Sequence, residues 1–138
     1  MVDLLDLGQS VLKAQPFSAY IGAQLVSLAP GSAVLTLDIR PELLQQHGFV
    51  HGGVVSYLVD NALAFAGGSV LGGNVVTAEY KVSFLRPAKG DQLIARATVE
   101  ASGARLATVR CDVIAMQAGK ESRCAIGLGT IVVLSPGP

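Results

Sequence analysis

The sequence predicts an α+β domain in which one antiparallel β-sheet packs against a single long, buried helix. Segments of alternating apolar and polar residues, separated by turn residues, fill the second half of the chain and are typical of hairpin-connected strands. One apolar stretch that begins near residue 52 is too long for a strand and predicts a helix. With 138 residues, the chain is most simply one domain over residues 1–138, with its core at about 17–134.

Short elements come before the long helix. The first dozen residues space their leucines and valine as a short amphipathic helix does. Residues 16–41 predict two strands around the turn Pro30-Gly31-Ser32, and the second of them alternates with a period of two over residues 33–39. The expected order is therefore a short helix, two strands, the long helix and four more strands.

The long helix is expected to run from Gly52 to about Gly67, where the pair Gly67-Gly68 would end it. Four strands should follow, and their hairpin-length links make them antiparallel neighbours. They cover residues 74–87, 91–101, 105–117 and 122–134. A sheet that places its concave face against the helix is the simplest way to bury it.

The charge balance excludes some classes of partner. Ten basic and ten acidic residues give a formal net charge of zero, whereas binding to nucleic acid or to an anionic membrane needs a basic excess. Only 14% of residues are charged, which indicates that an oligomer hides part of the surface. We expect no membrane-spanning segment, and the acidic start of the chain lacks the basic region of a signal peptide.

The two cysteines predict the compartment. Cys111 alternates with apolar Val109 and Val113, and Cys124 with Ile126 and Leu128, without CxxC spacing or a nearby histidine. We expect reduced core thiols in a cytoplasmic protein and no metal site.

One acid stands inside the apolar helix. The residues one turn from Asp60 include no basic side chain, so no local ion pair compensates the carboxylate. Two interpretations remain open. Either a backbone group, the Tyr57 hydroxyl or solvent at an edge satisfies the carboxylate, or Asp60 serves as a general base or nucleophile.

The start of the helix offers a second chemical element. Gly52 and Gly53 have no side chains, so a ligand can reach the free N–H groups and the positive end of the helix dipole, which favour a developing oxyanion. Asp60 lies eight residues later, roughly 12 Å along the axis. Two antiparallel chains could bring Gly52 of one chain to Asp60 of the other. This predicts a homodimer with shared sites, and the low charge favours a tetramer of two such dimers.

Several motifs carry a family resemblance. "HGG" at residues 51–53, "LVDNA" around Asp60 and "TAEYKVSFLRPAKGD" from Thr77 onward resemble the hotdog-fold acyl-CoA thioesterases of the phenylacetate-degradation (PaaI) type. The resemblance covers roughly residues 17 to 134. It implies a hotdog fold and hydrolysis of acyl-CoA thioesters, aromatic or medium-chain, with coenzyme A entering as part of the substrate and no further cofactor.

The resemblance also implies roles for individual residues. Asp60 would be the nucleophile or general base, and Gly52 would offer its N–H to the thioester carbonyl. His51 would position the thioester or the loop, Gln45 would orient water or the carbonyl, and Thr77 would assist the acid. Gly53, Tyr57 and Arg86 are expected to contact the substrate, Arg86 near the pantetheine-phosphate arm.

Each of these residues also has a structural interpretation. His51, Gln45 and the neighbouring His47 could simply bond within the loop, Thr77 could be an ordinary strand residue, and Arg86 a surface charge. Two other functions stay open on the same fold. One is a hydratase or dehydratase of acyl thioesters, and the other is a non-catalytic acyl-CoA-binding module.

Overall fold

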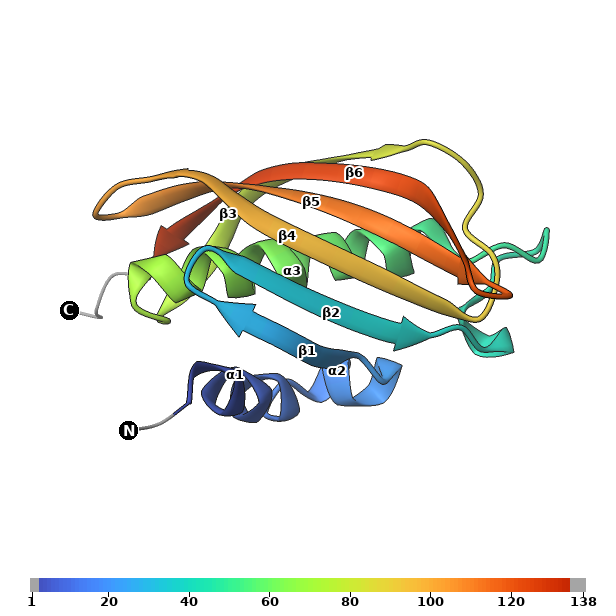
Figure 1. The fold of residues 1–138 in the computed structure, drawn as a ribbon, viewed down its shortest axis with the longest axis horizontal. Coiled ribbons are helices and arrows are strands. Elements are labelled where there is room, and N and C mark those ends of the chain that lie inside the picture. Colours follow the sequence, from blue (N-terminus) through green and yellow to red (C-terminus); the bar gives the residue numbers. More distant parts are fainter. Residues whose placement is uncertain (1–2, 135–138) are drawn as a thin grey trace.

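A six-stranded antiparallel sheet curves around one long helix in the computed structural model, which describes residues 3–134 (Figure 1). The predicted α+β class is confirmed. The sheet order is β1-β2-β4-β5-β6-β3. The elements are α1 (Leu4–Lys13), α2 (Pro16–Ile21), β1 (Gln24–Ala29), β2 (Ser32–Asp38), the 3-10 turn η1 (Pro41–Leu43), α3 (Gly52–Leu71), β3 (Val75–Phe84), β4 (Gln92–Ser102), β5 (Leu106–Gln117) and β6 (Lys120–Val133).

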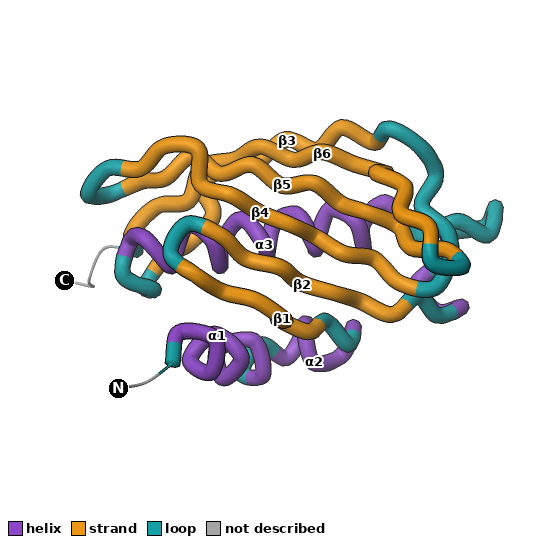
Figure 2. The backbone as a smooth tube through the Cα atoms, in the orientation of Figure 1, coloured by secondary structure: helices purple, strands orange, loops and turns teal. Residues whose placement is uncertain are grey.

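Helix α3 lies in the concavity of the sheet, and the interface between them is the core (Figure 2). Leu58, Leu63 and Ala66 on this helix are fully buried. Strand β6 has glycines where the helix comes nearest: a Cβ on Gly127 would lie 2.3 Å from a methyl group of Val59. The close approach therefore requires a glycine at this point of the strand.

The predicted end of the long helix is wrong. Gly67 lies inside α3 and does not end it. The glycine is needed there for packing, since a Cβ at this position would lie 2.7 Å from Cβ of Ile131. The helix continues to Leu71 and ends at Gly72, whose φ of 97° is the left-handed conformation typical of a helix C-terminus.

The first of the two predicted early strands is also partly wrong. Residues Pro16–Ile21 form α2, which has proline at its first position and ends at Gly22 with φ of 91°. Strand β1 begins only at Gln24. Helix α1 packs beside β1 so closely that a Cβ on Gly8 would lie 2.6 Å from a methyl carbon of Leu25. Figure 1 shows α1 lying along this edge of the sheet.

The prediction that the last four strands are all sequential neighbours is wrong. Strand β3 pairs with β6 at the far edge, and β4 pairs with β2. The link between β3 and β4 crosses the ends of β6 and β5: the Leu85 N–H donates to the Cys124 carbonyl, and the Asp91 N–H donates to the Met116 carbonyl. Gly90, with φ of 127°, leaves no room for a side chain against Met116. The hairpins β4–β5 and β5–β6 are confirmed.

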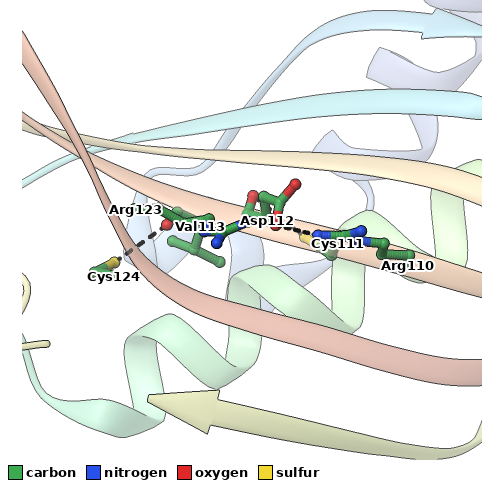
Figure 3. A network of polar contacts seen from close by, with 6 residues as sticks. All are labelled: Arg110, Cys111, Asp112, Val113, Arg123 and Cys124. Atoms are coloured by element: carbon green, nitrogen blue, oxygen red, sulfur yellow. Dashed lines mark hydrogen bonds and ion pairs between the residues drawn. The ribbon is translucent and has the colours of Figure 1, made fainter. Parts of the chain in front are cut away.

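Both cysteines are buried and free, as predicted, and Figure 3 shows the polar contacts around them. Cys111 lies in the core with Val109 and Val113. The alternation proposed for Cys124 is wrong, because the register of β5 and β6 shifts between Val113 and Ile114 and Cys124 stands at the irregularity. Its thiol donates to the Val113 carbonyl at 3.4 Å, while Leu128 is half exposed.

By length and composition alone, helix α3 is long and apolar enough to cross a membrane. No segment of this kind was expected from the sequence. More than half of its apolar window is buried against the sheet. In this fold it is the core helix.

Candidate active site

One face of α3 is not covered by the sheet. The side chains along it are half-buried rather than buried, at Ser56, Tyr57, Asp60, Asn61 and Ala64. These positions recur every three or four residues, so they form one stripe. The expectation of a buried helix therefore does not hold for this face of α3 within a single chain, and Asp60 lies on this open stripe.

The carboxylate of Asp60 has one hydrogen-bond donor, the hydroxyl of Thr77, at 2.7 Å from Oδ1. Thr77 belongs to the edge strand β3, where the register shifts immediately after it. No ion pair involves Asp60 among residues 3–134, where the four salt bridges lie elsewhere. The carboxylate is thus oriented by a neutral donor on one of its two oxygens.

A hydrogen bond from the Tyr57 hydroxyl was one predicted way to satisfy the Asp60 carboxylate, but Tyr57 does not bond to Asp60. Its hydroxyl lies 2.6 Å from Oγ of Ser18 and accepts from Nδ2 of Asn61 at 3.0 Å. Burial raises the pKa of Tyr57, and the nearby charge of Asp60 adds to this, while the hydrogen bonds with Ser18 and Asn61 oppose it. The ring of Phe17 meets the Tyr57 ring edge-on, with 5.2 Å between centroids. Tyr57 therefore joins α2 to α3.

The start of α3 is capped by His51. Its Nδ1 accepts from the Gly53 N–H at 2.8 Å, so in the neutral ring the proton sits on Nε2. The N–H of Gly52 has no acceptor among the described residues. A Cβ on Gly52 would lie at ordinary contact distance, 3.4 Å, from the ring of Phe84. A free N–H at the positive end of a 20-residue helix can donate to a carbonyl oxygen that gains negative charge.

A hollow of about 340 Å³ lies in front of this helix start. Gln45, Gly52, Phe84 and Arg86 line it together. The side-chain carbonyl of Gln45 accepts from the His47 N–H, so Gln45 also holds its own turn. Three of the residues singled out in the sequence thus meet at one hollow.

The two chemical elements stay apart within one chain. Asp60 and Thr77 do not line the hollow at Gly52, and eight residues of helix separate Asp60 from Gly52, roughly 12 Å along the axis. Each chain therefore carries the Asp60 carboxylate and the free Gly52 N–H at two separate places. Among residues 3–134, no group of three His, Cys, Asp or Glu side chains could hold a metal ion.

Sequence reasoning missed the partners of Tyr57 and the ring beside Gly52. Ser18, almost completely buried at 1% exposure, lies in a segment taken for a strand, so its position facing α3 was not predicted. Asn61, next to Asp60, donates to both Ser18 and Gln15. Phe84 belongs to the "FLRPA" run that carried the resemblance, but its place beside Gly52 at the hollow was not predicted.

Comparison with known proteins decides the family. The sequence pattern of the thioesterase superfamily matches residues 47–121, a range that holds both Gly52 and Asp60. The chain belongs to the thioesterase superfamily. Its solved neighbour from Silicibacter pomeroyi, a thioesterase family protein, has a TM-score of 0.90 and 32% identity, and the match covers 96% of this chain and 100% of the other. The predicted hotdog thioesterase fold is confirmed.

Two further relatives are similar to this chain over most of its length. The acyl-coenzyme A thioesterase PaaI of Escherichia coli is 32% identical over 70% of this chain and 69% of its own length. A presumed esterase of Deinococcus radiodurans is 35% identical over 86% of this chain and 80% of the other. The superfamily member described here therefore has PaaI-like relatives at modest identity.

Proposed function

We propose that this thioesterase-superfamily protein hydrolyses acyl-CoA thioesters, with Asp60 as the general base or the nucleophile. The observation that carries the proposal is the half-buried, unpaired carboxylate of Asp60 on the open stripe of α3, held by the Thr77 hydroxyl. The PaaI relative of E. coli, named as an acyl-coenzyme A thioesterase, supports the substrate class.

The chemistry needs one carboxylate and one water. As a general base, Asp60 takes a proton from water while the water oxygen bonds to the thioester carbon. The C–S bond then breaks, and the thiolate of CoA receives the proton to leave as the thiol, with the free acid as the other product. As a nucleophile, Asp60 forms a mixed anhydride and releases CoA, and water then hydrolyses the anhydride.

The free N–H of Gly52 donates a hydrogen bond to the carbonyl oxygen and so stabilises the negative charge that develops there. This donor belongs to a second chain, since the helix separates Gly52 from Asp60 within one chain. A homodimer with two shared sites follows, and two dimers can form a tetramer. His51 would hold the helix start through its bond to Gly53, and Gln45 and Arg86 would contact the thioester and its pantetheine arm in the hollow.

The substrate is an aromatic acyl-CoA, such as phenylacetyl- or hydroxyphenylacetyl-CoA, or a medium-chain one.

A panel of acyl-CoAs with a thiol reagent tests the activity by the release of free CoA. Asp60→Ala and Asp60→Asn should abolish release with the fold intact, while Asp38→Asn, which changes an exposed carboxylate bonded only by Gln92, should not.

Other results would assign another function. Loss of enoyl-CoA absorbance without free thiol would make the protein a hydratase, and tight acyl-CoA binding without turnover would make it a binding module. CoA release at an unchanged rate in both Asp60 variants would remove Asp60 from the chemistry.

A further inference from the structure

Helix α3 and the edge strand β3 meet along one seam, with a side-chain contact at successive turns of the helix. At the first turn, Gly52 lies beside an aromatic ring of β3, and two turns later Asp60 accepts from the hydroxyl of Thr77. Between these contacts, Oγ of Ser56 lies 2.8 Å from the hydroxyl oxygen of Tyr80. Ser56 stands midway in sequence between Gly52 and Asp60, about 6 Å along the axis from each.

The backbone of β3 aims Tyr80 at the helix. In a regular strand, Thr77 and Tyr80 would point to opposite sides of the sheet, because they are an odd number of residues apart. The register with β6 shifts after Thr77, so Ala78 is an extra residue and both side chains reach α3. Gly129 pairs with Tyr80, and a Cβ on this glycine would lie 2.7 Å from Cβ of Tyr80. The bulge and the glycine thus admit a side chain that is 37% exposed and lies outside the core.

The hydroxyl pair has hydrogen-bonding capacity to spare. One of its two hydroxyl protons makes the bond between Ser56 and Tyr80, so the pair keeps a second proton and further lone pairs. Ser56 is half-buried on the open stripe, and Tyr80 belongs to a strand at the end of the sheet. The pair therefore faces the side of the fold that a single chain leaves open.

The two-chain site places this pair opposite its own copy. When two antiparallel α3 helices set Gly52 of one chain against Asp60 of the other, the residue midway between them lies on the two-fold axis. That residue is Ser56, and the Tyr80 hydroxyl comes with it. Four hydroxyl groups then gather at the axis, and each pair can donate its spare proton to the other.

We propose that the Ser56–Tyr80 pair is a positioning element of the active site, which meets the same pair of a second copy on the dimer axis and holds the register that sets Gly52 against Asp60. The proposal rests on the proposed function, since the shared site supplies this register. Ser56 and Tyr80 contact neither the thioester nor the attacking water. They act by fixing the two helices against each other.

A cysteine cross-link tests the place of Ser56 without any substrate. Facing residues on helices packed about 8 to 10 Å apart come within reach of a disulfide, which needs Cα atoms about 4.4 to 6.8 Å apart. Ser56→Cys should therefore form a covalent dimer under mild oxidation, whereas the wild-type protein, whose Cys111 and Cys124 are buried, should not. Ala64→Cys is the matched control on the same stripe, because its two copies would lie about 24 Å apart along the axis.

Removal of either hydroxyl tests the positioning role. Tyr80→Phe and Ser56→Ala should each raise the dissociation constant of the dimer by about tenfold and lower kcat by about tenfold with KM nearly unchanged. The double variant should lose no more than the single ones, because both hydroxyls act through one bond. Ser56→Thr keeps a hydroxyl and should stay near wild type, and Tyr20→Phe removes an exposed hydroxyl elsewhere and should change neither quantity. Analytical ultracentrifugation and steady-state kinetics measure the two.

The results separate this proposal from the proposed function. If Ser56→Cys cross-links and Tyr80→Phe weakens the dimer, but no acyl-CoA is hydrolysed, the function fails and the place of the pair stands. No cross-link in Ser56→Cys, an equal yield in Ala64→Cys, or an unchanged dimer dissociation constant in both hydroxyl variants would overturn the proposal, whether or not the wild-type protein releases CoA.

Discussion

Thr77 and Asp60 join the edge strand of the sheet to the open stripe of the central helix, with 2.7 Å between Oγ1 and Oδ1. The two residues are 17 positions apart and belong to elements that meet only in the folded chain. Because the hydroxyl occupies one carboxylate oxygen, the other oxygen is left to act on water or on the substrate.

Removal of the Thr77 hydroxyl should therefore slow the reaction. In Thr77→Ala, the carboxylate loses its fixed orientation, and we expect kcat to fall by about tenfold to a hundredfold, an effect typical of a lost positioning contact. Thr77→Ser keeps the donor and should retain most of the activity. Steady-state kinetics with the best acyl-CoA of the panel checks this, and equal losses in both variants would show that the methyl group, not the hydroxyl, matters.

Loss of the His51 cap should destabilise the protein. His51→Ala leaves the Gly53 N–H without its partner, and a lost N-cap costs about 1 kcal/mol of the free energy of unfolding. His51→Asn, which can also accept from this N–H, should recover most of the loss. Urea unfolding measures both, with His47→Ala as control, and a stability of His51→Ala equal to wild type would contradict the cap.

The Tyr57 hydroxyl should also contribute to stability. Tyr57→Phe leaves Ser18 and Asn61 without a shared partner in a half-buried place, which should cost about 1 to 2 kcal/mol of the free energy of unfolding. Tyr20→Phe is the matched control, because Tyr20 is 82% exposed. Similar unfolding midpoints for the two variants would show that the bonds at Tyr57 contribute nothing.

The thiols should be inert in the native protein. Burial, with the charge of Asp112 adding to it, raises the pKa of Cys111 to about 12, and burial also raises the pKa of Cys124. Because the thiolate is the reactive form, a disulfide reagent at pH 8 should modify neither cysteine until the protein unfolds. Rapid modification of the folded protein would contradict this burial.

The raised pKa of Cys111 also sets a pH dependence of stability. The native state holds the thiol proton that the unfolded chain loses above its ordinary pKa of 9.0, so this contribution is complete below pH 9 and is lost as pH rises toward 12. Cys111→Ala should lose less stability than wild type between these pH values. Parallel curves in urea unfolding at several pH values would contradict the shift.

The fold was largely predictable because its elements have strong periodic signals. The alternation in β4, β5 and β6 and the apolar run of α3 need no long-range information. The failures have a common cause, since local sequence does not distinguish a glycine that ends a helix from Gly67, which makes room for Ile131. Likewise, nothing near Gly90 indicates that its link crosses two strands instead of closing a hairpin.

The candidate site residues were singled out one by one from the sequence, and the way they lie together was not predicted. The resemblance singled out Asp60 and Thr77 separately, and only the fold brings them into contact. The role of each site residue stays a prediction until the variants are measured.

The central claim is that each site combines Asp60 of one chain with the Gly52 N–H of another. Asp60→Ala removes the carboxylate, and Gly52→Val blocks access to the N–H, although Phe84 leaves space for its Cβ. Each variant alone should be inactive. A hybrid dimer would carry both lesions in one site and none in the other, so about half of the wild-type activity per hybrid should return. No recovery in chains shown to have exchanged would mean that each site is built within a single chain.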